Sequence, residues 1–335
     1  MDSPSGTTSS GRRAGAGASA DADDGPGKVL ITGISGNLGR LLARRLHRVA
    51  PVIGVDRRPF RKGPKDIETV QVDIRRRKAE DVFRTHRIDA VVHLNILHDP
   101  RKTAYDHHTY NVVGTRKIID YCEKYGVRKF LVLSTANVYG PRPENTQFLT
   151  EDAPLLGDQD FHEIRDLITV DHLAQSFFWK VPEVETVILR PVHILGRVHN
   201  APSNYLRLRR PPTVMGFDPM VQVIHEEDVV RAVALALRPG VRGVFNIVGP
   251  GEVPLSRMLG VLHKKPLPFP AFVGEPLLRA LWKWRLTSFP PREVDYIRFQ
   301  CTVDGALARR ILGFEPEFSL RDTIRCLEAD GLLRR

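Results

Sequence analysis

Lys28–Gly39, KVLITGISGNLG, is the most informative stretch of this sequence. Its opening residues, Lys28–Thr32, are mostly β-branched or apolar, which predicts a buried strand. Three glycines follow at a spacing of three residues: Gly33, Gly36 and Gly39. Leu38–Leu46 then has the pattern of a helix. A strand, a glycine turn and a helix in this order predict an anion site, because the first N–H groups and the dipole of the helix point toward bound phosphate.

A glycine turn alone is also common in proteins that bind no nucleotide. Here its context favours a dinucleotide site, because the next apolar run, Val52–Val55, ends in Asp56. A carboxylate at this point would accept hydrogen bonds from the adenosine ribose and repel a 2′-phosphate, so NAD is favoured over NADP. Arg57 and Arg58 follow at once and could accommodate that phosphate, which keeps NADP open.

Strands and helices alternate outward from this stretch. Further strands are expected at Thr69–Val72, Ala90–Leu94, Lys129–Leu133 and Val187–Leu189, and long helices at Asn111–Tyr125 and Phe161–Lys180. This order predicts an α/β fold of the Rossmann type, a doubly wound parallel sheet whose ligand lies at the carboxyl ends of the strands. We expect a disordered tail over 1–27, an NAD(P)-binding Rossmann domain over 28–190, and a smaller C-terminal substrate lobe over 191–335 that is interleaved with the sheet.

The composition is that of an ordinary globular chain with an excess of positive charge. The 335 residues carry a formal net charge of +11, but no known nucleic-acid-binding module accompanies the basic clusters, so nucleic acid is not the favoured partner. No run approaches the roughly 18 apolar residues needed to cross a bilayer, and the N-terminus lacks the apolar core of a secretory signal. The three cysteines lack metal-ligand spacing, which indicates a reducing, cytoplasmic setting and no metal site.

A series of further motifs connects the chain to a known family. In order, they are TGISGNLG, VDIR, VVHL, NVVGTRKIIDYC, LSTANVYGP, LRPVHILG, VIHEEDVVRAV, GVFNIVG and LARRILGFEP. With these motifs the chain resembles, over about Lys28–Leu327, the extended short-chain dehydrogenases/reductases of the NAD-dependent epimerase/dehydratase type, which act on sugar nucleotides. The resemblance implies that the glycine turn holds the pyrophosphate, that Asp56 binds the ribose, and that Asp73 and Ile74 lie beside the adenine. It likewise implies that Thr135 is the active-site hydroxyl.

The predicted site thus has a complete cofactor half and an incomplete reaction half. The cofactor-binding set is Gly33, Ser35, Gly36, Asn37, Leu38, Gly39, Asp56, Arg57, Asp73, Ile74, Leu94, Asn95, Asn111 and Pro191. Family members react through a Tyr-x-x-x-Lys pair on the helix after the fifth strand, in which the lysine lowers the pKa of the tyrosine. Leu167 and Asp171 stand at these two positions, and no tyrosine occurs between Tyr139 and Tyr205. The usual base is absent, so we predict atypical redox chemistry.

Other residues are candidates for the missing role. His193 follows the sixth strand and is the best replacement, because imidazole titrates near neutral pH. Asp166 and Asp171 lie five positions apart, about 140° around a helix, so both cannot face one substrate. A hydrogen-bonded structural role is the favoured alternative for each of these residues. We predict Thr135 and His193 as the catalytic residues, and we favour a ligand-facing role for Thr135.

The C-terminal half carries two unusual segments. His225–Asp228, HEED, begins a predicted helix whose dipole stabilises acidic residues, so we expect structural acids there and no metal. Residues 266–291 are rich in proline and aromatic side chains and include Trp282 and Trp284. They could form an apolar lid or a membrane-surface helix. We favour a hydrophobic cover on the lobe, because the two tryptophans point to different sides of a helix.

Three functions follow from these patterns. We favour an NAD(P)-binding enzyme that resembles sugar-nucleotide epimerases/dehydratases and performs redox chemistry with replaced groups. The alternatives are a non-catalytic sensor or scaffold that holds a dinucleotide, and a protein that binds RNA or anionic lipid through an inherited fold. The expected partner is a small-molecule substrate that is nucleotide-linked or partly apolar. A homodimer is a further expectation, with apolar surface supplied by Ile164, Leu167, Ile168 and Phe178.

Overall fold

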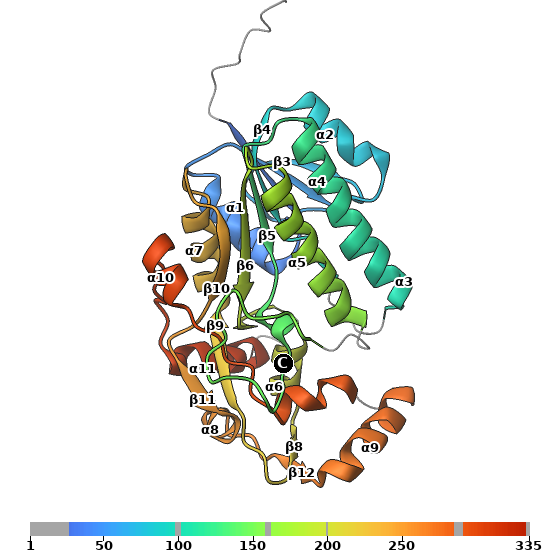
Figure 1. The fold of residues 1–335 in the computed structure, drawn as a ribbon, viewed down its shortest axis with the longest axis vertical. Helices are drawn as coiled ribbons and strands as arrows, with labels where there is room; N and C mark the ends of the chain where they lie inside the picture. The colour runs from blue at the N-terminus through green and yellow to red at the C-terminus, as the bar shows by residue number, and fades with distance from the viewer. Residues whose placement is uncertain (1–26, 98–101, 158–161, 199, 285–290, 333–335) are drawn as a thin grey trace, which may run out of the picture.

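A parallel sheet forms the centre of the molecule (Figure 1). The structure, a computed structural model, describes residues 27–332 except 98–101, 158–161, 199 and 285–290. The sheet has seven strands in the order β10-β6-β5-β4-β1-β2-β3, and each neighbouring pair is parallel. The strands are β1 (Lys28–Thr32), β2 (Val52–Asp56), β3 (Glu68–Gln71), β4 (Ile88–His93), β5 (Lys129–Leu133), β6 (Glu185–Pro191) and β10 (Gly243–Ile247). This arrangement confirms the predicted doubly wound Rossmann-type fold.

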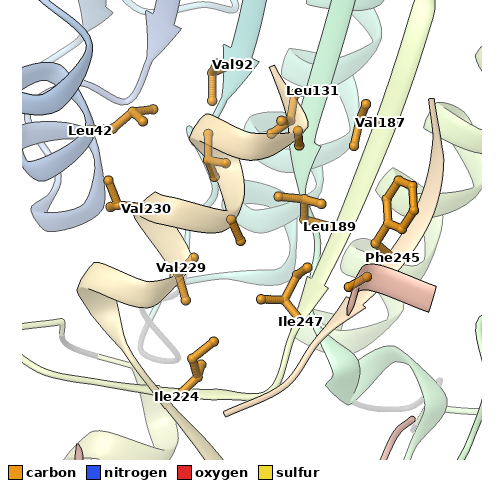
Figure 2. Close-up of a cluster of buried hydrophobic side chains, with 14 of the residues drawn as sticks. Leu42, Val92, Leu131, Val187, Leu189, Ile224, Val229, Val230, Phe245 and Ile247 are labelled. Atoms are coloured by element: carbon orange, nitrogen blue, oxygen red, sulfur yellow. The ribbon is translucent and has the colours of Figure 1, made fainter. Parts of the chain in front are cut away.

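Helices cover both faces of the sheet (Figure 1). One face carries α2 (Glu80–Thr85), α4 (Gly114–Lys124) and α5 (His162–Lys180), and the other carries α1 (Asn37–Leu46) and α7 (Glu226–Ala236). Figure 2 shows the core under α1 and α7, where Leu42 and Val230 lie against the strands that carry Val92 and Leu131. Helices on both faces bury the central strands, which is why these strands have continuous apolar sequences, whereas the edge strand β3 is mostly exposed.

The strand order reverses beside β1. The chain runs from β1 outward to β2 and β3, and then returns to place β4 on the other side of β1. The loops that leave β1 and β4 therefore part from each other at the carboxyl ends of these strands. Such a reversal opens the crevice in which open α/β sheets bind their ligands. The glycine turn after β1 stands at this crevice.

The helix expected at Asn111–Tyr125 begins earlier and is interrupted. It opens with α3 (Ala104–His107), continues through a π-helical turn η2 (His108–Val113), and becomes α4. Thr103 starts the run with a capping box, because its hydroxyl accepts from the Asp106 N–H while the Asp106 carboxylate accepts from the Thr103 N–H. A π turn inside a helix often marks a functional site. Here it carries Tyr110 and Asn111, whose contacts at the site are described below.

The C-terminal lobe is built from short elements around a core of its own. A three-stranded sheet contains β11 (Glu252–Pro254), β9 (Met220–His225) and β7 (His193–Leu195), and a two-stranded sheet pairs β12 (Leu267–Phe269) with β8 (Pro212–Val214). The helices are α6 (Ala201–Arg207), α8 (Leu255–Val261), α9 (Ala271–Lys283), η4 (Pro291–Ile297), α10 (Ala306–Leu312) and α11 (Leu320–Leu332). Since β10 and α7 return from this half to the main sheet, the two halves share one framework. The domain boundary at 190/191 remains a prediction.

The observed burial bears on two expectations about apolar surface. Ile164, Leu167 and Ile168 are 4%, 3% and 7% exposed, so these three pack inside the chain and do not supply a dimer surface. In α9, Leu278 is buried in the core of the lobe, whereas Phe272 is 83% exposed. The helix α9 therefore has an inner and an outer apolar side, and residues 285–290 of the predicted segment lie outside the described residues. Among the described helices, none combines the length and the hydropathy that a membrane span needs.

Candidate functional site

A cavity of about 690 Å³ lies at the carboxyl ends of the central strands. It extends from the glycine turn, past the ends of β4, β5 and β6, into the C-terminal lobe, where β9, α6 and α8 line it. Such a volume is in the range of ordinary ligand pockets. The cavity therefore joins the predicted cofactor half and the predicted substrate half in one space.

The glycine turn has the geometry that a dinucleotide pyrophosphate requires. Gly33 has φ +78°, a left-handed conformation that favours glycine. A Cβ on Gly39 would stand 2.7 Å from the Ile34 Cα, so only glycine lets α1 pack this closely on the turn. Gly36 is the N-cap residue of α1, whose first turn contains no acidic residue. The open N-terminus of α1 thus borders the cavity without a competing carboxylate, and the site fits a pyrophosphate.

Asp56 ties the end of β2 to the glycine turn. Its Oδ2 accepts from the Ser35 N–H at 3.0 Å, and its Oδ1 accepts from the Arg58 N–H at 2.9 Å. The residue is only 3% exposed and does not line the cavity. Arg57 and Arg58, which follow it, do line the cavity. The carboxylate therefore holds the turn in shape, while two guanidinium groups border the space beside it.

Ten of the predicted cofactor residues line the cavity: Gly33, Ser35, Gly36, Asn37, Leu38, Gly39, Arg57, Leu94, Asn95 and Pro191. Besides Asp56, three do not. Asp73 forms an ion pair with Arg75 at 2.7 Å, and Ile74 is buried in the core under α2 and α4. Asn111 is also buried, where it accepts from the Leu97 N–H at 2.7 Å and donates to the Leu97 carbonyl at 3.2 Å. Asn111 therefore fixes the backbone of the loop after β4, whose side chains border the cavity.

The π turn adds one cavity residue that the sequence analysis did not identify. Tyr110 lines the cavity and donates its hydroxyl to the Asn95 Oδ1 at 2.8 Å. The Asn95 Nδ2 is buried and has no hydrogen-bond partner among the described residues, which leaves a donor at the cavity for a ligand. Arg57 and Arg75 lie 4.9 and 5.2 Å from the centre of the Tyr110 ring. In the sequence, the only indication that Tyr110 belongs to the site is its position directly before the motif NVVGT. Arg58 and Lys102 also line the cavity.

The helix α5 places Leu167 at the cavity and Asp171 in the protein interior. Leu167 lines the cavity with an apolar side chain. Asp171 is fully buried and pairs with Arg190 through two hydrogen bonds, Nη2 to Oδ1 at 2.7 Å and Nε to Oδ2 at 2.9 Å. Burial opposes ionisation, but the Arg190 guanidinium holds the pKa of Asp171 below its usual range. The carboxylate is saturated by Ser134 at 2.6 Å and Gln175 at 2.7 Å, so it is not available as a general base.

The ion pair of Asp171 and Arg190 is part of a larger buried hydrogen-bond network. Arg190, itself 1% exposed, donates to the Tyr139 hydroxyl at 2.7 Å and to the Glu151 carbonyl at 3.0 Å. The Tyr139 hydroxyl in turn donates to the Asn246 Oδ1 at 2.8 Å. This network joins α5, β6, β10 and the turn after β5. Asp171 therefore has a structural role, because it connects α5 to the strands at this side of the sheet.

Thr135 and His193 both line the cavity. Thr135 accepts from the Asn137 N–H at 3.2 Å, which orients its hydroxyl at the end of β5. His193 enters the cavity from β7, and burial lowers its pKa to about 4. This lowered pKa differs from the titration near neutral pH expected of an imidazole, because the surrounding protein disfavours the charged form. At pH 7 His193 is a neutral hydrogen-bonding group.

The remaining titratable candidates have structural positions. Asp166 is buried and faces His108, with 3.5 Å between its Oδ1 and the His108 Nδ1. Asp166 and Asp171 thus point to different neighbours, as their spacing on the helix predicts. In HEED, Asp228 accepts from the backbone N–H groups of Glu317 and Phe318 at 2.9 and 3.3 Å and does not line the cavity. Within the described ranges, no group of three His, Cys, Asp or Glu side chains could hold a metal.

Comparisons with known proteins agree with this geometry. The NAD dependent epimerase/dehydratase family matches residues 29–248. An uncharacterized protein of Mycobacterium tuberculosis (strain ATCC 25618 / H37Rv) is 28% identical over 306 residues, which are 88% of this chain and 81% of that protein. The UDP-glucuronate 4-epimerase of Thermodesulfobacterium geofontis is 28% identical over 329 residues, 89% of this chain and 94% of the enzyme.

A solved structure gives the same result for the fold. The UDP-glucuronic acid 4-epimerase of Bacillus cereus, solved in complex with NAD, superposes with a TM-score of 0.72 at 19% identity and covers 92% of this chain and 100% of that one. The family match extends over more than half of the sequence, from the central strand β1 before the glycine turn to the edge strand β10. The chain is a member of the NAD-dependent epimerase/dehydratase family of extended short-chain dehydrogenases/reductases.

Proposed function

We propose that this protein binds NAD(P) and catalyses a redox reaction on a small molecule without a Tyr-Lys pair. One observation carries the proposal. A glycine turn shaped for a pyrophosphate opens into the same cavity as Thr135 and His193, whereas Leu167 and the saturated Asp171 occupy the positions of the usual pair. The first part supports cofactor binding, and the second part supports chemistry that differs from that of ordinary family members.

The residues around the turn would hold the dinucleotide. The N–H groups at the start of α1 would bind the pyrophosphate, and Arg57 with Tyr110 would border the adenosine. When bound, the nicotinamide would supply the group that accepts or donates a hydride. We propose NAD as the cofactor, because the UDP-glucuronic acid 4-epimerase of Bacillus cereus, which shares this fold, was solved in complex with NAD. The Asp56 carboxylate does not decide the choice, because the Ser35 and Arg58 N–H groups occupy it. Arg57 and Arg58 are the residues that could instead favour NADP.

Thr135 and His193 would act on the substrate. The Thr135 hydroxyl can donate a hydrogen bond to a substrate oxygen, and the neutral imidazole of His193 can accept the proton of a substrate hydroxyl. Because burial lowers the pKa of His193 to about 4, this imidazole is a weak base. We therefore expect turnover to be slow compared with a phenolate-based enzyme.

Thermal unfolding with NAD⁺, NADH, NADP⁺ and NADPH in turn tests the proposal. Ligand at a hundred times its dissociation constant adds about 2.7 kcal/mol to the free energy of unfolding. For a folded body of roughly 300 residues, this raises the melting temperature by about 4 °C. A shift with NAD⁺ or NADH that exceeds the shift with the phosphorylated forms supports NAD.

Two substitutions of Gly36 provide the matched control. A Cβ on Gly36 would meet the Gly33 carbonyl at 3.2 Å and the Arg58 Nη2 at 3.8 Å, and the space beyond its Cα is otherwise open. Gly36→Ala should therefore fold and keep most of the shift, whereas Gly36→Asp should fold and lose it, because a carboxylate would face the pyrophosphate. Equal shifts in both variants would contradict the assigned site.

Two alternatives have distinct signatures. A sensor or scaffold would bind the dinucleotide, but no substrate would change the absorbance of the bound nicotinamide. A protein of the third class would show no dinucleotide shift. The exposed Phe272 at the start of α9 and the positive charge of Lys283 at its end favour anionic lipid over RNA as its partner.

A further inference from the structure

We propose that the substrate half of the cavity accepts an uncharged, largely apolar molecule with a hydroxyl or carbonyl group, and not a nucleotide diphosphate. The inference rests on the proposed function, because the oxidisable or reducible group would meet the cofactor half of the same cavity. It concerns the part of the cavity formed by α5 and the C-terminal lobe.

This part of the cavity has apolar walls. Side chains from four different elements contribute, namely Leu167 of α5, Ile194 of β7, Val221 and Val223 of β9, and Leu255 and Met258 of α8. Each of these positions belongs to a helix or strand that packs on a core, so the wall is a fixed surface of the fold. Apolar surface of this kind favours an apolar ligand, because water is released when the ligand covers it.

Positive charge is absent from the same walls. The Lys and Arg residues that line the cavity are Arg57, Arg58 and Lys102, all from the N-terminal part of the chain. Among the described lining residues after Lys102, Glu163 is the only charged one, and its charge is negative. The elements that form these walls therefore offer a diphosphate a carboxylate and no cation of their own, and burying its charges without partners is unfavourable.

Two arginines of the C-terminal lobe, Arg207 and Arg298, contact other groups. Arg207 donates to the carbonyls of Gly196 and Val198 at 2.7 and 3.1 Å, and to the Ser203 hydroxyl at 2.8 Å. Arg298 lies 4.9 Å from the centre of the Phe217 ring. Neither residue lines the cavity. The fold therefore uses these guanidinium groups for its own backbone and rings.

The polar groups that remain are neutral. Thr135, Asn137, His193, Asn204 and Tyr296 line the cavity. They provide hydroxyl, amide, imidazole and phenol groups, which suit the single oxygen of an alcohol or ketone. The walls thus combine apolar surface for the body of a ligand with a few neutral partners for its reacting group.

A displacement experiment on the full chain tests the inference. Nile red, an uncharged fluorophore that brightens in apolar surroundings, is bound to the protein in the presence of NADH, and then 1-decanol or UDP-glucose is added. We expect 1-decanol to displace Nile red and to raise the melting temperature, whereas UDP-glucose does neither. Displacement by UDP-glucose and not by 1-decanol would overturn the inference.

Two variants locate the bound probe. Ile194→Asp places a carboxylate on the apolar wall and should weaken Nile red binding at least tenfold, while the NADH shift is retained. Phe272→Ser removes an apolar side chain that is 83% exposed outside the cavity and should leave both signals unchanged. Loss of the signal in Phe272→Ser and not in Ile194→Asp would place the probe on the surface and overturn the inference.

The outcomes separate this inference from the proposed function. If NADH produces no melting shift in the unaltered chain, the proposed function fails. If NADH binds and UDP-glucose is the competitor that displaces the probe, only the substrate class fails. Should Ile194→Asp not fold, the competition on the unaltered chain decides the question, because it requires no substitution.

Discussion

Asp171→Asn tests whether the residue at the position of the family lysine serves the structure. The substitution keeps the shape of the side chain and removes its negative charge. Arg190, which is 1% exposed, would then hold a buried positive charge without a carboxylate. The two hydrogen bonds from Arg190 and the bond from the Ser134 hydroxyl would lose their charged acceptor.

The size of the effect follows from the burial of both partners. Breaking a buried ion pair by removing one charge destabilises a protein by about 3–5 kcal/mol, because the other charge is left uncompensated. For a folded body of roughly 300 residues, this corresponds to a fall of about 5–8 °C in melting temperature. Asp171→Lys should cost more, since it would place a second cation beside Arg190. For that reason Leu167→Tyr with Asp171→Lys should not restore a working pair.

Thermal unfolding at pH 7 measures the effect, and Asp81→Asn is the matched control. Asp81 and Arg84 also form an ion pair at 2.7 Å, but their side chains are 48% and 68% exposed. Exposed pairs contribute about 0–1 kcal/mol, so this control should melt within about 2 °C of the unaltered chain. Equal losses for Asp171→Asn and Asp81→Asn would refute the argument.

A double substitution gives a second check. Asp171→Asn with Arg190→Met removes both buried charges, so the double variant should lose less stability than the sum of the two single losses. Strict additivity would show that the two side chains do not depend on each other.

The pH dependence of the stabilisation by Asp171 has a defined sign. Because the folded state lowers the pKa of Asp171, the stabilisation is complete above its usual value near 3.8 and is lost as the pH falls through the folded-state pKa.

Three further predictions concern the site. Gly39→Ala should lower the melting temperature and abolish the dinucleotide shift, because its Cβ would lie 2.7 Å from the Ile34 Cα and push α1 off the turn. Circular dichroism melting with and without NADH measures both effects. An unchanged shift would contradict the assigned packing. Asp56→Ala should weaken dinucleotide binding by tenfold or more, because the Ser35 and Arg58 N–H groups lose their shared acceptor; titration with NADH measures this loss, which Asp81→Asn should not cause. His193 should stay neutral down to a pH of about 4, so an NMR titration should show no His193 inflection between pH 5 and 8; an inflection in that range would show that the imidazole is less buried than described.

The local parts of the fold were predictable from residue order. The run Lys28–Thr32 is apolar, and the glycines after it permit the left-handed φ of Gly33 and the close approach of Gly39, so strand, turn and helix follow from neighbouring residues. The strands at the centre of the sheet were found within about two residues of their observed bounds, because burial on both faces demands continuous apolar runs. The start of α3 at Ala104 was missed, since its signal is a capping box on Thr103 and not an apolar repeat.

The roles of side chains were less predictable, because they depend on distant neighbours. Ile164 and Leu167 were predicted as apolar surface for a partner, yet both are buried within the same chain and border its cavity. Asn111 was expected beside the cofactor, and it instead fastens the backbone of Leu97. Tyr110, which borders the cavity, carries no pattern of its own. In each case the sequence gives the type of residue, whereas the tertiary packing determines which groups its side chain contacts.

By itself the sequence determined the order of strands and helices, the glycine turn, and the absence of a tyrosine from α5, because each of these depends on residues close together in the chain. Only the tertiary structure decided that Asp171 neutralises Arg190, which lies on another element, and that Tyr139 bonds to Asn246 from a third. It also decided the charge of His193, since burial among residues from several elements lowers its pKa to about 4. The physical reason is the same throughout. Backbone conformation responds to neighbours in sequence, whereas solvation and charge respond to neighbours in space.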